Sequence, residues 1–520
     1  MAAINPIIPG FAPDPSVVKV GEWYYLVNST FHLFPGLPIY ASQDLVSWKH
    51  IGKVHLSPSQ ATSSTNKLPG NAINRPEQLR LTQSRTNLVQ LDNDAREVML
   101  ATGGLYAPTI RFHEGTFYIV CTNVMHLADT TRPENFVIST TDILANTWSD
   151  PVYFDFDGID PSLLFDEGKV YVQGSRGPGP ATTINQFELD LATGAKGDER
   201  TIWRGTGGIY PEGPHLYRRG EWYYLVISEG GTHGGHCITV ARARGVWGPY
   251  EACPANPVLT ATGTDEYVQY TGHCDIFKDG EGEWWGVCLG VRKDEAGRFV
   301  MGRESFLTRA GWEDGWPTLD RVKVRPRALE AGAAFSAAPG VDLVYIRDPD
   351  LGRYETSVDG AVTLTPSSTE LSHQEDSPTF IGKRQRRLDG ESSVTLHPAA
   401  PWADAGVRAG IAVYKDEHRY LSLVLDASSS EIVFELRNGA KEVERGERRA
   451  VGAGGVALRI EYTEKEYRLW YAVGAGEATC LGVVDTLEMT GPDFVGPVIG
   501  AFAVAKVEGV RVECTGLSVE

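Results

Sequence analysis

The chain has 520 residues, of which 42% are hydrophobic and 22% are charged, a composition typical of globular proteins. This length exceeds one ordinary core, so we expect two domains, or one repeat architecture with an additional domain. The formal net charge of -19 at pH 7 would repel a polyanion, which argues against nucleic acid as a partner. We find neither a membrane-spanning apolar run nor an export signal, so we expect no membrane partner. The expected location is cytoplasmic for the chain as given, or secreted if a signal peptide has been removed.

A short pattern recurs five times in the N-terminal part of the chain. Each copy has a short strand, a polar turn with glycine and a second strand rich in aromatic and β-branched residues, which predicts a β-hairpin. The copies open at Asp14, Ala107, Asp160, Glu212 and His273. Apart from the first, the spacings between these opening positions have the size of propeller blades. We therefore predict a five-bladed β-propeller over residues 1–325.

The first spacing is long because residues 55–100 form an insertion rich in Ser, Thr, Asn and Gln. Loops at the mouth of a propeller shape the pocket that lies there. We expect this insertion to close the site into a cup instead of an open groove.

The composition changes after residue 324, and a stretch rich in Ala, Gly and Pro predicts a linker over residues 326–341. Beyond it, apolar and polar residues alternate in long segments, with turns such as Asn438-Gly439 between them. This pattern predicts a β-sandwich of the jelly-roll or concanavalin-like kind over residues 342–520. The whole chain is thus predicted to be all-β. Whether the sandwich supports the propeller, binds polymer or contributes to the active site is left open.

The repeat places acids at one end of the predicted channel. Inner strands of a propeller run side by side, so Asp14, Asp160 and Glu212 should converge at one mouth. Asp-Pro and Glu-Gly-Pro also start ordinary turns, where the carboxylate caps local backbone groups. Three acids in register favour a catalytic site over turn chemistry. Converging carboxylates are typical of glycoside hydrolysis, where one protonates the leaving oxygen and another activates water or attacks.

Several motifs along the same part of the chain make this interpretation specific. They include "NPIIPGFAPDPS" (5–16), "STFHLFPGLPIYASQDLVSW" (29–48), "GGLYAPTI" (103–110), "GIDPSLLFD" (158–166), "YPEGPHLY" (210–217), "YTGHCDIF" (270–277) and "MGRESFL" (301–307). In this order they resemble glycoside hydrolase family 43, the inverting β-xylosidases, α-L-arabinofuranosidases and arabinanases built on a five-bladed propeller.

The resemblance implies a role for each acid. Asp14 is the general base that deprotonates the attacking water, and Glu212 is the general acid that protonates the departing sugar oxygen. Asp160 lies near Glu212, raises its pKa by like-charge proximity and orients it. Asp14 and Glu212 belong to the first and fourth blades, so a water fits between carboxyl groups roughly 6.5–9.5 Å apart, which predicts inversion.

The same resemblance implies that Arg292, Phe31 and Phe34 contact the terminal sugar. It also implies that His273 reaches into the channel, where in many relatives such a histidine helps to hold Ca²⁺ through waters, although no cofactor is required. The alternatives are a surface ion pair for Arg292, core packing for the two phenylalanines and a metal-free buried histidine.

Two further histidines, His233 and His236, have no carboxylate nearby in the sequence to complete a metal site, and they are not assigned.

The implied function is release of terminal β-D-xylose, α-L-arabinofuranose or both from xylo-oligosaccharides or arabinoxylan. The alternatives are an α-L-arabinofuranosidase specific for arabinan or arabinoxylan side chains, and a non-catalytic sugar-binding propeller. A retaining fructosidase would show Asn-Asp-Pro-Asn-Gly near the start and Glu-Cys at the acid. Here Asp14 follows a proline and Glu212 precedes a glycine, so these two positions do not match the fructosidase motifs. The sequence does not fix the oligomeric state.

Overall fold

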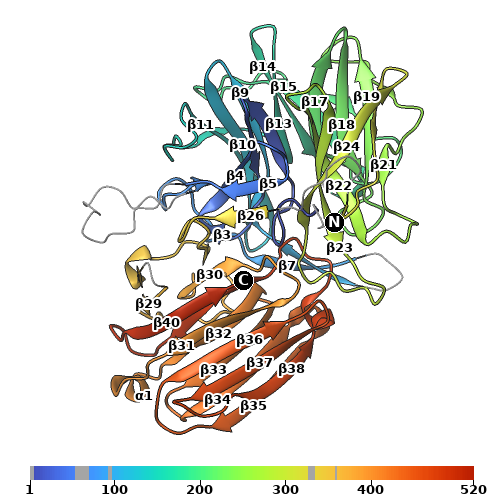
Figure 1. The fold of residues 1–520 in the computed structure, drawn as a ribbon. Coiled ribbons are helices and arrows are strands. Elements are labelled where there is room, and N and C mark those ends of the chain that lie inside the picture. The colour runs from blue at the N-terminus through green and yellow to red at the C-terminus, as the bar shows by residue number, and fades with distance from the viewer. Residues whose placement is uncertain (1–4, 53–69, 92–96, 178, 326–333, 358–359) are drawn as a thin grey trace.

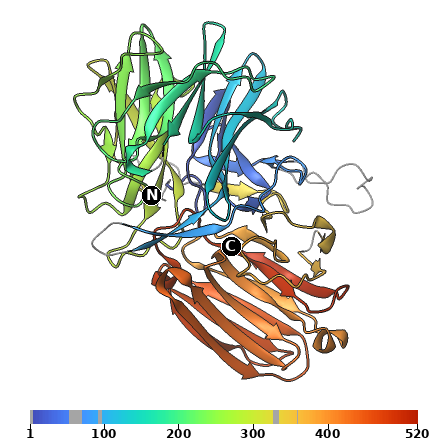
Figure 2. The same cartoon turned by 180° about the vertical axis from the view of Figure 1, so that it is seen from behind.

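The computed structural model describes residues 5–52, 70–91, 97–177, 179–325, 334–357 and 360–520. Figures 1 and 2 show two stacked parts, with the N-terminal sheets above and the C-terminal sheets below. Within the described residues the one α-helix is α1 (Pro401–Asp404), and four 3-10 turns accompany it. The prediction of an all-β chain is confirmed. Among these residues, no helix has the length and apolar character needed to cross a membrane.

Five sheets form the N-terminal part, and their strands pair antiparallel except for β26 at the edge of the first. The first contains β1 (Ser16–Val20), β2 (Trp23–Val27), β4 (Gly36–Ser42), β5 (Ser47–His50) and β26 (Ala334–Ala337), with β6 (Asn71–Ile73) beside β4. The second contains β9 (Gly104–His113), β10 (Thr116–His126), β11 (Thr131–Thr140) and β12 (Val152–Phe154). The third contains β13 (Gly158–Asp166), β14 (Lys169–Arg176), β15 (Thr183–Glu188) and β16 (Arg200–Trp203).

The last two sheets follow the same order. The fourth contains β17 (Glu212–Arg219), β18 (Trp222–Glu229), β19 (Cys237–Ala243) and β20 (Glu251–Ala252), with β21 (Leu259–Thr260) beside β19. The fifth contains β22 (Val268–Lys278), β23 (Trp284–Arg292), β24 (Glu304–Glu313) and β25 (Trp316–Leu319). The first strand of each sheet contacts its counterparts in the order β1, β9, β13, β17, β22 and back to β1. The predicted five-bladed propeller is confirmed.

The ring is closed by the residues that precede β1. Ile8 forms an antiparallel bridge with Ser305 of β24, and the Ala12 amide donates to the Arg303 carbonyl at 3.0 Å. The buried side chain of Asn5 donates to the carbonyls of Leu307 at 2.7 Å and Lys323 at 2.8 Å. Its own oxygen accepts from the Leu307 amide at 2.8 Å. The start of the chain is therefore fastened to the last blade.

The predicted linker contains a strand. Residues 326–333 of that prediction lie outside the described residues, but β26 pairs in parallel with β5 and so extends the first blade. The apolar side chain of Phe335 packs against the core of that blade, so the segment is more than a spacer. The alternation of small and apolar residues at 334–337 is too short for the sequence to have indicated a strand.

Part of the predicted insertion forms a hairpin of β7 (Thr86–Gln90) and β8 (Val98–Thr102). Residues 53–69 and 92–96 of the insertion lie outside the described residues. The hairpin contacts the C-terminal part, because the Leu100 amide donates to the Pro492 carbonyl at 2.9 Å. The short strands β3 (Leu33–Phe34) and β27 (Tyr345–Ile346) make a second connection between the parts.

Two stacked antiparallel sheets form the C-terminal part, as predicted for a β-sandwich. One sheet has the order β28 (Tyr354–Thr356), β29 (Val362–Leu364), β40 (Val512–Val519), β31 (Gly390–Leu396), β36 (Val456–Tyr462), β37 (Glu466–Val473) and β38 (Thr479–Asp485). The other has the order β30 (Phe380–Arg384), β39 (Val498–Val504), β32 (Arg408–Asp416), β33 (Arg419–Asp426), β34 (Glu431–Asn438) and β35 (Val443–Ala450). In β36 every second residue is buried, as expected when one face of a strand packs on the core.

The interface between the two parts is apolar and also contains a buried ion pair. Phe11, Phe31 and Leu33 of the propeller cluster with Tyr414 and Val498 of the sandwich. The ion pair joins Arg347 to Glu417 at 2.9 Å, with both side chains fully buried. The two parts therefore form a continuous packed structure.

Replacing Asn5 tests the ring closure. Asn5→Ala would leave the Leu307 amide and two carbonyls without partners, so we expect the free energy of unfolding to fall by roughly 2–3 kcal/mol. Asn5→Asp keeps an acceptor for the Leu307 amide but sets a carboxylate against two carbonyls, and should also destabilise. Denaturant unfolding measures both effects, and wild-type stability in both variants would contradict this closure.

Candidate active site

The inner strands β9, β13, β17 and β22 each have an irregularity in their pairing near the start, and β1 begins two residues after the corresponding position, Asp14. In β13, Asp160 and Pro161 interrupt the regular pairing with β14, and in β17, Gly213 and Pro214 do the same opposite β18. The residues at this position are Asp14, Ala107, Asp160, Gly213 and His273, and all have positive φ angles of 52°, 23°, 55°, 58° and 45°. The repeat thus places a left-handed residue at the same position in all five blades, within four of the inner strands and just before β1.

The pairing corrects one prediction. Glu212 does not occupy the position of Asp14 and Asp160 but lies one residue earlier, where β13 has Ile159. Glycine takes the bend in the fourth blade because a Cβ at Gly213 would lie 2.8 Å from Nδ1 of His273, in a left-handed conformation. The sequence alignment of "YPEGP" with "FAPDP" placed the two acids in register and missed this shift.

The three acids nevertheless line one cavity of about 570 Å³. Its wall comes from the blades, from the β7–β8 hairpin and from the sandwich. The lining residues are Asp14, Phe31, Leu91, Met99, Tyr106, Ala107, Ile159, Asp160, Ile209, Tyr210, Glu212, Ser228, Gly230, Gly231, Thr232, His233, Gly234, His236, His273, Leu289, Arg303 and Phe494. Leu91 and Met99 belong to the predicted insertion, which therefore contributes to the wall of the site as expected.

Asp14 is a buried carboxylate among hydrogen-bond donors and cations. Ser29 Oγ donates to its Oδ2 at 2.6 Å, Arg303 Nη1 lies 3.4 Å from its Oδ1, and Nδ1 of His273 lies 3.8 Å from the same oxygen. Burial alone would raise the pKa of Asp14, but Arg303, His273 and Ser29 together lower it below its usual value. Asp14 is therefore ionised at neutral pH and can accept a proton.

The pKa values of Asp160 and Glu212 are shifted in the opposite direction from that of Asp14. Burial and the neighbouring carboxylates Asp160 and Asp14 raise the pKa of Glu212 to about 8, so this carboxyl group holds a proton at neutral pH. Burial and Asp14 also raise the pKa of Asp160, whose Oδ2 accepts from the Gly213 amide at 3.0 Å. That amide follows Glu212 directly, so Asp160 is connected to the backbone that carries the acid. The cavity thus combines a proton acceptor with a proton donor.

The arginine beside these acids is Arg303, and the prediction for Arg292 is wrong. Arg292 forms a two-point ion pair with the fully buried Glu304, at 2.7 and 2.8 Å, and does not line the cavity. Glu304 Oε1 also accepts from the Gly10 amide at 2.6 Å, so this pair holds the closure of the ring. Arg303 was within the quoted motif "MGRESFL", but nothing in the sequence separated it from other arginines.

The two predicted phenylalanines have different positions. Phe31 lines the cavity and packs on Tyr106, with ring centroids 4.8 Å apart. Phe34 packs in the core against the sandwich-side strand β27, so its predicted contact with sugar is wrong and the core-packing alternative holds.

The sandwich contributes Phe494 to the cavity wall, with its ring 5.8 Å from those of Phe31 and Tyr106. Its carbonyl accepts from Arg303 Nη2 at 3.0 Å. The residue lies outside the repeat, so the propeller pattern held no signal for it.

The histidines lie in and below the cavity. His273, His233 and His236 all line it. His236 Nδ1 is 3.0 Å from the Tyr270 carbonyl, and burial lowers the pKa of its ring to about 4, so His236 is neutral and not part of an ion pair.

The channel below His273 does not fit a calcium site. The carboxylate of Asp275, two residues after His273, accepts from Arg111 Nη1 at 2.8 Å, from Ser16 at 2.7 Å and from Tyr217 at 2.5 Å. Arg111 Nη2 also lies 3.1 Å from Nδ1 of His215. A guanidinium already neutralises the oxygen ligands that Ca²⁺ would need. Within the described residues, no group of three or more His, Cys, Asp or Glu side chains is arranged to hold a metal ion.

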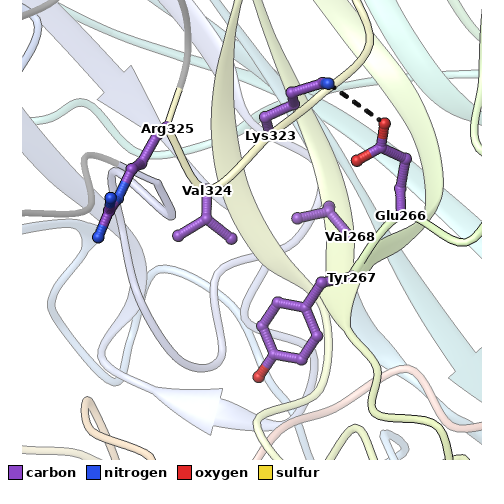
Figure 3. Close-up of a pocket in the computed structure, with 6 residues that line it drawn as sticks. All are labelled: Glu266, Tyr267, Val268, Lys323, Val324 and Arg325. Carbon is purple, nitrogen blue, oxygen red and sulfur yellow. Dashed lines mark ion pairs between the residues drawn. The ribbon is translucent and has the colours of Figure 1, made fainter.

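A second hollow, of about 410 Å³, lies at the start of β22 (Figure 3). Figure 3 shows Glu266 facing Lys323, to which it is paired at 3.4 Å. Tyr267 is hydrogen-bonded to Glu464 of the sandwich. Among the residues that line this hollow, the only carboxylate is ion-paired, so the acid–base chemistry belongs to the larger cavity.

A propeller that buries an ionised carboxylate beside a protonated one has the equipment of a glycoside hydrolase. Comparison with known proteins gives the family. Residues 3–317 match the model of "Glycosyl hydrolases family 43", and residues 335–514 match "Beta xylosidase C-terminal Concanavalin A-like domain". The chain belongs to glycoside hydrolase family 43, as its resemblance implied, and its C-terminal sandwich is of the concanavalin-like kind.

Individual relatives match the sequence of this chain over almost its full length. The chain is 32% identical to the non-reducing end α-L-arabinofuranosidase BoGH43B of Bacteroides ovatus, over 96% of this chain and 90% of the relative. It is 29% identical to xylosidase/arabinosidase 43B of Humicola insolens, over 98% and 96%. The structure of a Bacteroides ovatus xyloglucan PUL GH43B superposes with a TM-score of 0.82 at 30% identity, covering 98% of each chain.

The reassignment of Arg292 can be tested by stability. Arg292→Met leaves a buried carboxylate with no cation, so we expect the free energy of unfolding to drop by about 3–5 kcal/mol. Adding Glu304→Gln removes the uncompensated charge and keeps an acceptor for the Gly10 amide, so most of the stability should return. If Arg292 served the substrate instead, Arg292→Met would unfold like wild type and lose activity only.

Proposed function

We propose that this enzyme is an inverting exo-hydrolase that releases terminal β-D-xylose, α-L-arabinofuranose or both from xylo-oligosaccharides or arabinoxylan. The observation that carries the proposal is the opposite protonation of Asp14 and Glu212 in one cavity. A cavity with walls from the blades, the β7–β8 hairpin and Phe494 suits the end of a chain. The names of the relatives support both sugars, and an enzyme restricted to arabinofuranose side chains is the second candidate.

In the proposed mechanism, Asp14 takes a proton from the water that attacks the anomeric carbon. Glu212 gives its proton to the glycosidic oxygen as the bond to the anomeric carbon breaks. The water oxygen becomes the new anomeric hydroxyl, and the two carboxyl groups exchange protonation states before solvent resets them. Asp160 keeps Glu212 protonated through its charge and holds the Gly213 amide. Arg303 keeps Asp14 ionised.

The roles of base and acid can be separated by leaving group. Asp14→Asn should lower kcat by about 10²–10⁴-fold on both 4-nitrophenyl glycosides and xylobiose, because both need an activated water. Glu212→Gln should cost as much on xylobiose but far less on 4-nitrophenyl glycosides, because 4-nitrophenolate leaves without a proton. Steady-state kinetics measures this, with Glu221→Gln in the exposed turn as the control. Equal losses of Glu212→Gln on both substrates would refute its role as the acid.

The pH profile tests Asp160. The active form has Glu212 protonated, so the rate should fall as the pH rises through about 8. Asp160→Asn removes a negative neighbour, which lowers the pKa of Glu212, so the alkaline limb of kcat/KM should move to lower pH by about one unit. Asp166→Asn, at the far end of β13, is the matched control. An unmoved limb in Asp160→Asn would show that Asp160 does not tune the acid.

Removing divalent metal tests the interpretation of the channel. Because Arg111 supplies the cation next to Asp275, we expect dialysis against EDTA to leave kcat and the melting temperature unchanged. A loss of either one that Ca²⁺ restores would contradict this interpretation.

A further inference from the structure

Residues 490–496 of the sandwich reach from the turn after β38 into the propeller. The Pro492 carbonyl accepts from the Leu100 amide of β8 at 2.9 Å. On the other side the backbones come so close that a Cβ at Gly302 would lie 2.8 Å from Cα of Gly496. Residues 490–496 therefore lie between the β7–β8 hairpin and the residues that lead into β24.

A chain of contacts starts in this segment and ends at the proposed base. The Phe494 carbonyl accepts from Arg303 Nη2 at 3.0 Å and from Arg303 Nε at 3.4 Å. The guanidinium also lies 5.2 Å from the centre of the Phe494 ring. From there Arg303 Nη1 reaches Oδ1 of Asp14 at 3.4 Å. Arg303 Nη1 also donates to Thr232 Oγ1 at 3.2 Å, so the Phe494 carbonyl holds the Nη2 and Nε edge of the guanidinium while Nη1 faces Thr232 and Asp14.

The residue before Phe494 is held by two buried cations. The carboxylate of Asp493 accepts from Lys415 Nζ at 2.6 Å and forms a second pair with Arg419. All three side chains are at most 1% exposed, and Lys415 also donates to the Met489 carbonyl at 3.1 Å. Taking three charges out of water is costly, and hydrophobic residues could fill the same volume at least as stably. What such a cluster provides is a fixed geometry for the backbone that carries it.

We propose that Lys415, Asp493 and Arg419 form a positioning cluster, through which the sandwich holds Arg303 against Asp14. None of the three lines the cavity, so they act through the backbone of Phe494 and not on the substrate. The inference rests on the proposed function, since it takes Asp14 as the base. It assigns the sandwich a part in catalysis beyond the contact of the Phe494 ring.

Lys415→Met is the variant that tests the cluster, because it removes one of the two cations and leaves Asp493 paired with Arg419. The matched control is Arg408→Met, which breaks the ion pairs of Arg408 with Glu370 and Glu435 at the other end of the same strand, β32. Circular dichroism and thermal melting show that both variants are folded before kinetics are compared.

A double-mutant cycle with Arg303→Lys separates positioning from a general structural effect. We expect Lys415→Met to lower kcat/KM about tenfold in the wild-type background and less than twofold in the Arg303→Lys background, because its effect passes through Arg303. Arg408→Met should change neither. Equal losses from Lys415→Met in both backgrounds, or no loss in the first, would overturn the proposal.

A second readout does not need activity. The side-chain Nε–H of Arg303, assigned by its disappearance in Arg303→Lys, should be protected from hydrogen exchange in wild type. In Lys415→Met its protection factor should fall at least tenfold. If the wild type hydrolyses no glycoside, the proposed function fails, and this exchange measurement still decides the inference. Unchanged protection would overturn it.

Discussion

The site depends on burying three carboxylates within one cavity. Burial and mutual repulsion disfavour the ionised form of neighbouring carboxylates, so the protein must keep at least one of them protonated and stabilise another as an anion. Arg303, His273 and Ser29 stabilise the anion at Asp14, while burial and the neighbouring carboxylates Asp160 and Asp14 raise the pKa of Glu212 to about 8. The division into base and acid follows from this arrangement, because the cations and the donor surround Asp14, whereas Glu212 is buried beside carboxylates.

Segments from both the N-terminal and the C-terminal parts of the chain hold the charged groups of the site in place. Asp14 and Asp160 occupy the left-handed position of their blades and Glu212 directly precedes it, and the ring is closed by Asn5 and by the Glu304–Arg292 pair. The sandwich then supplies the backbone of Phe494, which receives the Arg303 guanidinium. The propeller alone therefore leaves Arg303 without one of its acceptors.

The repeat was the most informative part of the sequence. It predicted the blades and the meeting of Asp14, Asp160 and Glu212, because hairpins of one length around a ring must bring equivalent strand starts together. It could not show that Gly213 takes the bend, since that depends on the nearby ring of His273. It could not separate Arg303 from Arg292, or find Phe494, because those contacts join segments that are distant in the sequence and follow no period.

The most direct test of the account is the configuration of the released sugar. Proton NMR during hydrolysis of xylobiose or a 4-nitrophenyl glycoside shows the anomer before mutarotation scrambles it. If Asp14 activates water while Glu212 protonates the leaving oxygen, the first product formed must have the inverted configuration. A product with the starting configuration would mean that a carboxylate attacks the sugar directly, and would contradict the role given to Asp14.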